Sequence, residues 1–211
     1  LVSRILSWSA IKILAIDWSE RMLVIKHRVN TISELLATPK DFGVEVDIRP
    51  YKDTLILHHD PFIEGESLEE YLKNFSHRFI ILELKSEGIE NRVIELAEKF
   101  GIADYFLLSA TPPAMRKLMN REFTKFAVRF SDMESVETCK FWAGKADWVW
   151  VDIFRDFPLD EQSASLLKKN FKICSISPEV IGLRGALERY RGKMRSLNID
   201  AICTDLPDLW K

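Results

Sequence analysis

Eight short apolar runs alternate with stretches of helical periodicity along most of the chain, and this alternation limits the fold more than any other feature. The runs are rich in β-branched and aromatic residues and too short for helices, so each predicts a strand. They span residues 23–27, 43–49, 79–84, 105–109, 125–130, 147–152, 171–176 and 199–203. Strands that alternate with helices form βαβ units and a parallel sheet, and eight such units predict a single-domain α/β fold, the (β/α)8 TIM barrel.

The segments between these runs carry helix signals. Thr31 and Glu34 have the spacing of a capping box, and Ser67 and Glu70 repeat it. Further helices are expected within residues 89–101, 112–119, 134–143, 160–169 and 183–196. An open doubly wound sheet is the alternative architecture, but it requires a Gly-rich phosphate turn after its first strand. The sequence there is "HRVN", which favours the barrel.

Composition narrows the class of protein and its partners. A chain of 211 residues fits one domain, and a net charge of −2 gives no sign of a broad nucleic-acid-binding surface. No apolar run of 18 residues is free of charge, so no membrane span is expected. The three cysteines are scattered without a CxxC pair, which predicts small buried side chains in a reducing compartment such as the cytoplasm.

The first 21 residues differ from the rest of the chain. Charged residues interrupt their apolar positions and no small-residue cleavage site follows, so they are a poor match to a signal peptide. Met22 stands directly before the first convincing strand. Two interpretations remain open: residues 1–21 are an upstream extension of a domain at 22–211, or they form an amphipathic helix against the barrel or a membrane surface.

Carboxylates lie on the second strand and at the end of the third. Glu45 and Asp47 are two residues apart and therefore point to the same face, and Glu83 ends the third strand. Carboxylates brought together at a barrel mouth repel one another and lose hydration, so they need a cation. Three acids without a Cys or His cluster indicate Mg²⁺ or Ca²⁺. Salt bridges to Arg49 and Lys85 are the simpler alternative.

Three of the four histidines also lie at predicted strand ends. They are His27, His58 and His59. Histidine exchanges protons near neutral pH, so two of them on opposite sides of a phosphate could serve as base and acid. Arg28 and Lys85 could hold the non-bridging oxygens of that phosphate.

Taken in order, these motifs resemble the glycerophosphodiester phosphodiesterases, within the superfamily of phospholipase C-like and sphingomyelinase D-like phosphodiesterases. The resemblance rests on "HR" after the first strand, "GVEVDIR", "HHDP", "ELK" and the closing "DAICTDLPDLW". It covers residues 22–211. The chain departs from the family in "HRVNT", which lacks the family's Gly and the Glu of its next loop. That short H-x-x-N form is similar to the sphingomyelinase D-type enzymes.

The resemblance implies a role for each matching residue. His27 and His59 would be the acid and base, since the family's second His directly precedes an Asp, here Asp60. The expected metal ligands are Glu45, Asp47 and Glu83, and the expected phosphate contacts are Arg28 and Lys85. The implied activity is metal-dependent hydrolysis of a small phosphodiester, glycerophosphodiester-like or sugar-linked, in lipid metabolism.

Two further expectations concern specificity and reaction type. Arg129 and Trp150, on the fifth and sixth strands, are candidates for substrate contact. One alternative activity is a phospholipase C- or sphingomyelinase D-like lyase that releases a cyclic phosphate. A barrel that binds a phosphorylated ligand without catalysis is the other alternative, and the full set of histidines and acids argues against it.

Overall fold

Eight parallel strands form the centre of the computed structural model, which describes residues 22–211. They are β1 (Leu23–Lys26), β2 (Gly43–Tyr51), β5 (Phe79–Leu84), β6 (Tyr105–Leu108), β7 (Ala127–Phe130), β8 (Trp148–Val151), β9 (Lys172–Ile176) and β10 (Ala201–Thr204). Every strand predicted from the sequence is present, with ends shifted by at most two residues. The proposed N-terminal extension lies outside the described residues.

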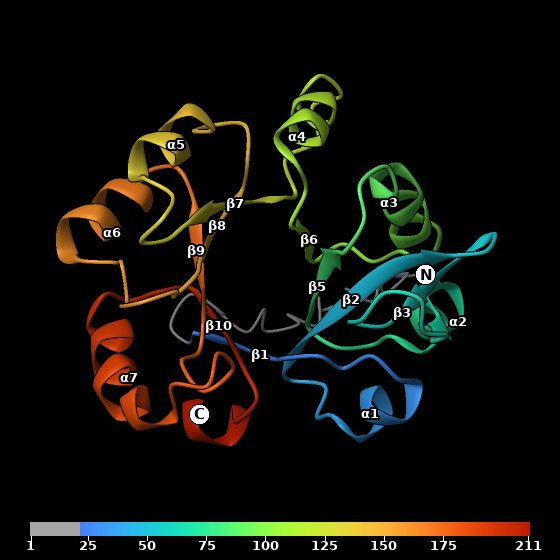
Figure 1. Cartoon of the computed structure of the whole chain (residues 1–211), viewed down its shortest axis with the longest axis horizontal. Helices are drawn as coiled ribbons and strands as arrows, with labels where there is room; N and C mark the ends of the chain where they lie inside the picture. Colours follow the sequence, from blue (N-terminus) through green and yellow to red (C-terminus); the bar gives the residue numbers. More distant parts are fainter. Residues whose placement is uncertain (1–21) are drawn as a thin grey trace, which may run out of the picture.

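These strands curl into a sheet in which neighbours are hydrogen-bonded in the order β6-β5-β2-β1-β10-β9-β8-β7. Figure 1 shows the curl viewed along the strands, with helices around its outside. The two end strands, β6 and β7, meet at a single parallel bridge between Leu107 and Phe126. The mixed α/β architecture expected from the sequence is confirmed, whereas a fully closed barrel is not, because the β6–β7 junction lacks a continuous ladder.

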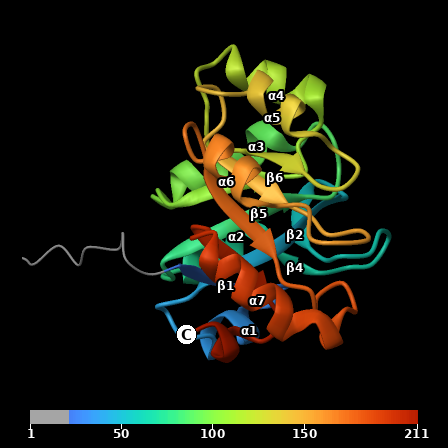
Figure 2. The same ribbon diagram turned by 90° about the vertical axis from the view of Figure 1, so that its left-hand side faces the viewer.

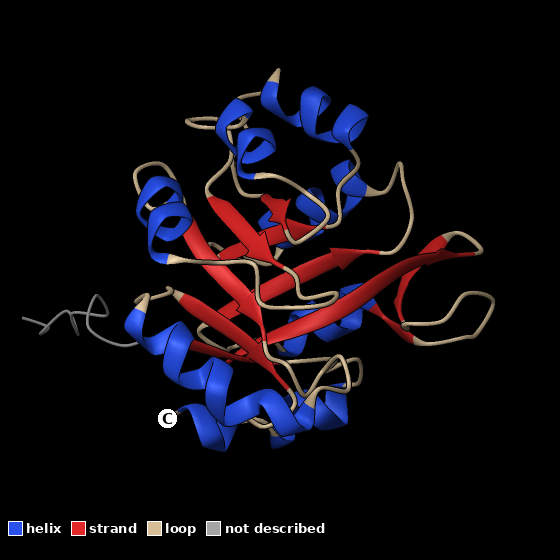
Figure 3. Ribbon diagram, turned by 60° about the vertical axis from the view of Figure 1, so that its left-hand side comes forward, coloured by secondary structure: helices blue, strands red, loops and turns tan. Residues whose placement is uncertain are grey.

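Helices follow the parallel strands and cover the outside of the sheet, as Figure 3 shows. They are α1 (Ile32–Ala37), α2 (Leu68–Asn74), α3 (Glu90–Lys99), α4 (Pro112–Met119), α5 (Val136–Phe141), α6 (Glu161–Leu167) and α7 (Leu187–Ser196), with 3-10 turns η2 (Arg184–Ala186) and η3 (Pro207–Trp210). The capping box of Thr31 and Glu34 is confirmed. At α2 only the Ser67 half of the expected box is present, because Glu70 pairs with Lys73 instead.

Two short strands lie outside the eight-strand pattern: β3 (Thr54–Leu57), the extended segment that leads to His58 and His59, and β4 (Glu66–Ser67), which was not predicted. β3 runs antiparallel to the end of β2, and β4 runs antiparallel to β3. The amide of His58 donates to the carbonyl of Asp47 at 3.0 Å. This excursion therefore returns the "HHD" segment to the carboxyl end of β2.

The two ends of the sheet are filled differently. Where the strands begin, the rings of Phe79, Phe106 and Trp148 lie with centroids 5.1–5.7 Å apart and close the interior with apolar surface. Buried polar side chains lie at the other end of the sheet, where the strands have their carboxyl ends. We call this end of the sheet the mouth. As expected, the three cysteines are buried and form no disulfide. Within residues 22–211, no helix is long and apolar enough to cross a membrane.

Candidate active site at the mouth of the barrel

Three carboxylates meet at the mouth. Glu45 and Asp47 alternate with valines along β2, and the register between β2 and β5 places Glu83 directly beside Asp47. One oxygen from each of the three lies within 4.8 Å of the others, close enough to bind one metal ion. We call these residues the acid trio. The structure thus brings together the metal ligands expected from the sequence.

Glu45 is the member of the acid trio with the least charge compensation. Its side chain is 1% exposed, and Oε2 accepts a hydrogen bond from the backbone amide of Arg28 at 2.7 Å. Oε1 is buried without any hydrogen-bond partner. Burial, reinforced by the charges of Asp47 and Glu83, raises the pKa of Glu45 well above its ordinary value. A carboxyl group in this position is stabilised by a proton or by a cation.

The other two members of the trio have cationic and polar partners. Burial alone would raise the pKa of Asp47, but the hydrogen bond from Asn30 and the charge of Lys85 bring it below its ordinary value. The Lys85 ammonium lies 3.0 Å from Asp47 Oδ1 and 2.8 Å from Glu83 Oε2. Asp47 Oδ1 nevertheless makes no well-aligned hydrogen bond. Ser109 donates to Glu83 at 3.0 Å.

His27 lies beside the trio and is oriented by a carboxylate from the opposite end of the chain. Its Nδ1 is 2.9 Å from Asp205 Oδ1, and its Nε2 is 3.8 Å from Glu45 Oε2. Burial lowers the pKa of His27, and the hydrogen bond with Asp205 offsets only part of this shift. The ring is therefore held with Nε2 directed toward the acid trio.

A buried carboxylate supports Asp205 in turn. Glu179 accepts hydrogen bonds from the hydroxyls of Ser177 and Thr204 and, at 3.2 Å, from the backbone amide of Asp205. The side chain is 5% exposed. Glu179 thus joins the loop after β9 to the end of β10 and holds the segment that carries Asp205.

His59 lies on the loop that follows β3, and like His27 it has a carboxylate oxygen beside its Nδ1. Its Nδ1 is 2.8 Å from Asp60 Oδ1, and its ring is 40% exposed. Arg49 donates to the carbonyl of His59 from Nε at 3.0 Å and to the carbonyl of Lys85 from a terminal nitrogen at 3.3 Å. Arg49 thus links this loop to the end of β5. The salt-bridge alternative for the acid trio holds for Lys85 and not for Arg49.

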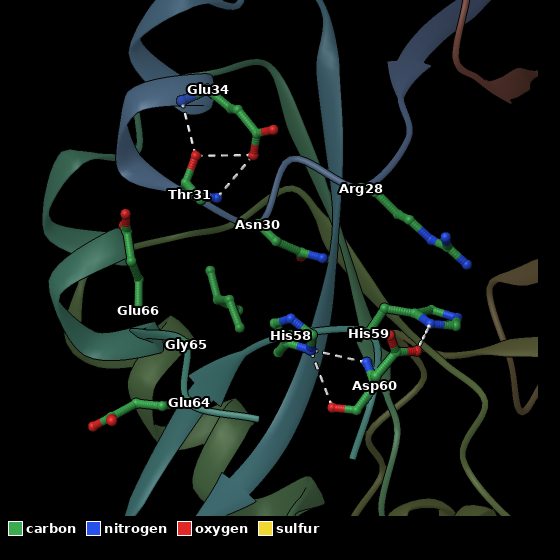
Figure 4. A pocket seen from close by; sticks show the side chains of 11 residues that line it. Arg28, Asn30, Thr31, Glu34, His58, His59, Asp60, Glu64, Gly65 and Glu66 are labelled. Carbon is green, nitrogen blue, oxygen red and sulfur yellow. Dashed lines mark hydrogen bonds and ion pairs between the residues drawn. The ribbon is translucent and has the colours of Figure 1, made fainter. Parts of the chain in front are cut away.

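An open pocket of about 890 Å³ lies beside the two histidine-bearing segments. Figure 4 shows Arg28, Asn30 and the "HHD" segment along its wall, with carboxylates opposite. His58 contacts the backbone of Asp60 through Nδ1, whereas His59 contacts the Asp60 carboxylate. The two adjacent histidines therefore bind different groups of the same residue. A cavity of this size next to titratable groups is typical of a small-molecule site.

The two residues expected to contact substrate, Arg129 and Trp150, lie on adjacent strands in register with each other. Arg129 forms an ion pair with Asp152 and donates to Ser109 at 2.9 Å. Trp150 is 3% exposed and belongs to the apolar core. Their contact with a substrate stays a prediction of the sequence.

Three residues that orient the site were not predicted as site residues. The sequence suggests Arg49 only as a salt-bridge partner of the acids, and Asp205 and Glu179 are not among the site residues that it predicts. The closing "TDLP" segment was a usable signal for Asp205, since it lies at the end of the eighth strand. Glu179 lies in a loop with no distinctive pattern, and its role depends on a contact 26 residues away.

Comparison of the sequence with protein-family models and with curated proteins gives no match. Solved structures do match. A glycerophosphodiester phosphodiesterase of Agrobacterium tumefaciens is similar with a TM-score of 0.62 at 15% identity, over 90% of this chain and 97% of that one. A glycerophosphoryl diester phosphodiesterase of Parabacteroides distasonis gives a TM-score of 0.63 at 14% identity, over 89% and 84%.

At 14–15% sequence identity, the similarity to these solved structures is evidence for a shared fold and not for a shared activity. The fold of this chain is that of the glycerophosphodiester phosphodiesterases, the family that its sequence motifs resemble.

Proposed function

We propose that this protein is a divalent-metal-dependent phosphodiester hydrolase of the glycerophosphodiester phosphodiesterase type. The observation that carries the proposal is the acid trio, whose oxygens lie within 4.8 Å of one another beside His27. Strands and loops far apart in sequence supply these groups to one mouth, where TIM-barrel enzymes hold their catalytic residues. The fold shared with known phosphodiesterases is consistent with this activity.

The acid trio fits a hard divalent cation, Mg²⁺ or Ca²⁺. Glu45 Oε1 is a buried oxygen without a hydrogen-bond donor, and Asp47 Oδ1 is a buried oxygen that makes no well-aligned hydrogen bond although the Lys85 ammonium lies 3.0 Å away. Carboxylate oxygens are the ligands that both ions prefer. Lys85 alone offsets part of the negative charge and leaves Glu45 without a cationic partner at hydrogen-bond distance. When bound, the ion would polarise the phosphodiester and stabilise the negative charge that develops on its oxygens.

His27 and His59 are proposed to exchange the protons of the reaction. Each ring has its Nδ1 within 2.9 Å of a carboxylate oxygen, from Asp205 and Asp60 respectively. Such a contact favours the tautomer with hydrogen on Nδ1 and leaves Nε2 free to accept or deliver a proton. One histidine would take a proton from the attacking water while the other protonates the leaving alcohol.

Arg28 and Lys85 are proposed to hold the phosphate. The Arg28 side chain is 48% exposed and lines the pocket, so its guanidinium can reach a ligand there. Its backbone adopts φ 51°, an uncommon left-handed conformation that accompanies the hydrogen bond from its amide to Glu45. Lys85 is 17% exposed and supplies a point charge between Asp47 and Glu83.

The open pocket beside Arg28 and His59 has room for the substituents of a phosphodiester, and the proposed substrate class is a glycerophosphodiester-like or sugar-linked phosphodiester. A reducing compartment and the lack of a nucleic-acid partner stay predictions of the sequence.

The test is hydrolysis of a generic aryl phosphodiester by the full chain. Activity should disappear with EDTA and return with Mg²⁺ or Ca²⁺. Product analysis by phosphorus NMR is then done on a glycerophosphodiester, whose glycerol hydroxyl lies beside the phosphate: an open phosphomonoester is expected for a hydrolase, and a cyclic phosphate for a lyase. A protein that cleaves no phosphodiester with either ion would contradict the proposal.

A further inference from the structure

Exposed large apolar side chains are concentrated on the loops of the mouth. The residues that the structure describes include ten such side chains, and seven of them lie on these loops. We call the seven the apolar tips: Phe62, Ile63, Met133, Phe154, Ile181, Leu183 and Leu206. They come from the loops after β3, β7, β8, β9 and β10. Figure 2 shows the loops after β3, β7, β8 and β9 projecting from the same side of the molecule.

The most prominent tip is Phe62. Its side chain is 98% exposed, and its backbone has φ 64°, a left-handed conformation that is unusual for a bulky residue. The loop is fixed at its far end by Gly65, where a Cβ atom would collide with the carbonyl of Leu57. Met133 and Phe154 are 73% and 52% exposed on two other loops. Folding leaves at least half of each of these three side chains exposed. A partner outside the chain would explain why apolar side chains stand in these places.

A lipid surface fits this arrangement better than a protein partner. The tips come from five separate loops at the same end of the sheet as the acid trio. A folded protein seated on all of them would cover the mouth and block the pocket. A lipid surface accepts separate apolar side chains into its interfacial region and can also present a phosphodiester to the mouth.

The charges beside the tips indicate what kind of lipid surface it is. Exposed or half-exposed acids of the mouth loops outnumber the bases: they are Asp53, Asp60, Glu64, Glu87, Asp132, Glu134, Asp156, Asp160 and Asp205 against Arg28, Lys52, Lys85, Arg155 and Arg184. Binding to anionic lipid requires clusters of Lys and Arg, which these loops lack. A zwitterionic surface, whose outermost group is a quaternary or primary ammonium, complements the acids.

We propose that the mouth docks on a zwitterionic phospholipid surface through the apolar tips and takes its phosphodiester from that surface. The second half of this statement rests on the function proposed above. The substrate class is then a phosphodiester whose alcohol carries an acyl or alkyl chain, with the chain held in the lipid and the phosphate at the acid trio.

Vesicle co-sedimentation of the full chain tests the docking without using activity. The probes are phosphatidylcholine vesicles and, separately, vesicles with added phosphatidylserine. The double variant Phe62→Ser with Met133→Ser removes two tips, and Leu36→Ser with Phe141→Ser is the matched control, since these side chains are 68% and 63% exposed on helices α1 and α5. We expect the tip variant to bind phosphatidylcholine vesicles roughly tenfold or more weakly, because Phe and Met side chains lose their burial in lipid. The control should bind like the unaltered protein.

Three results would overturn the docking proposal: no binding of the unaltered protein to phosphatidylcholine, equal binding by the tip variant, or binding only when phosphatidylserine is present. Hydrolysis of a soluble aryl phosphodiester is measured in parallel and should be the same in all variants. Binding without hydrolysis contradicts the proposed function alone, whereas hydrolysis without binding contradicts the docking alone.

Discussion

The two sides of the mouth differ in how their polar groups are satisfied. On the side formed by β1, β2 and β5, which we call the acid side, Glu45 and Asp47 each keep a buried oxygen that makes no well-aligned hydrogen bond, although the Lys85 ammonium lies 3.0 Å from that of Asp47. On the side formed by β7 and β8, the paired side, Arg129 contacts Asp152 and Ser109, and Ser131 bonds to Glu134. Within residues 22–211, no buried polar side-chain atom on the paired side lacks a partner.

This difference indicates where a ligand would act. Buried polar atoms without partners are costly, and a bound ligand can complete their bonding. The described residues also include such atoms on Tyr71, His77 and Trp210, but the acid trio is where two of them lie among carboxylates that could share one cation. The acid side has such atoms and the paired side has none among the described residues. We therefore expect substitutions on the acid side to affect chemistry and metal binding, and those on the paired side to affect mainly stability.

The largest expected effect is that of His59→Ala, compared with His58→Ala. His59 is 40% exposed, so its removal should leave the fold intact while it abolishes one proton transfer, and we expect the kcat for an aryl phosphodiester to fall about 1000-fold. His58→Ala should retain activity within about tenfold, because His58 bonds only to the backbone of Asp60. Circular dichroism checks folding. A larger loss of kcat in His58→Ala than in His59→Ala would show that His58, and not His59, transfers the proton.

The second-largest effect is expected on the stabilisation of the protein by a divalent ion, which substitutions on the acid side should remove and those on the paired side should not. A divalent ion at a hundredfold excess over its Kd stabilises a protein by about 2.7 kcal/mol, which for this size raises the Tm by about 5–10 °C. Asp47→Asn should lose this shift and about a hundredfold in activity. Asp152→Asn, on the paired side, should start from a lower Tm but keep the shift with Mg²⁺ or Ca²⁺. A full shift in Asp47→Asn would remove Asp47 from the metal site.

The strand order and the acid trio could be predicted because both depend on short-range patterns. The alternation of side chains places Glu45 beside Asp47, and parallel neighbours bring Glu83 to the same level. The closure of the barrel, which the same reasoning predicted, is not confirmed. Closure depends on the register between β6 and β7, where only Leu107 and Phe126 pair, and no local pattern encodes that register.

The orienting residues were missed for a related reason. Asp205 reaches His27 across 178 positions of sequence, and Arg49 reaches the carbonyl of Lys85 across 36. Local sequence reveals that these residues are polar and near a strand end, but it does not say which distant group each of them contacts. The sequence pattern thus predicted which side chains lie together on neighbouring strands. It did not predict the contacts made by residues of the loops.

A moderate effect is expected for Arg49→Met on the acid side. Arg49 does not line the pocket, but it donates hydrogen bonds to the carbonyls of His59 and Lys85. Its loss should therefore displace the backbone that carries these two residues. We expect kcat to fall about 10–100-fold with little change in KM. Arg92→Met is the matched control, since Arg92 donates only to the carbonyl of Asp53 in the β2–β3 turn. A merely structural role would lower the Tm and leave kcat unchanged.

The smallest effect on activity is expected for Arg129→Met on the paired side. Its loss leaves Asp152, 11% exposed, without its cation, so unfolding should become easier by about 1–3 kcal/mol. Activity should fall only a few-fold, through the contact of Ser109 with Glu83. Trp150→Phe, at a buried neighbour, controls for packing. Substrate contact by Arg129 would instead raise KM at least tenfold with Tm unchanged, and that result would make the paired side part of the binding site.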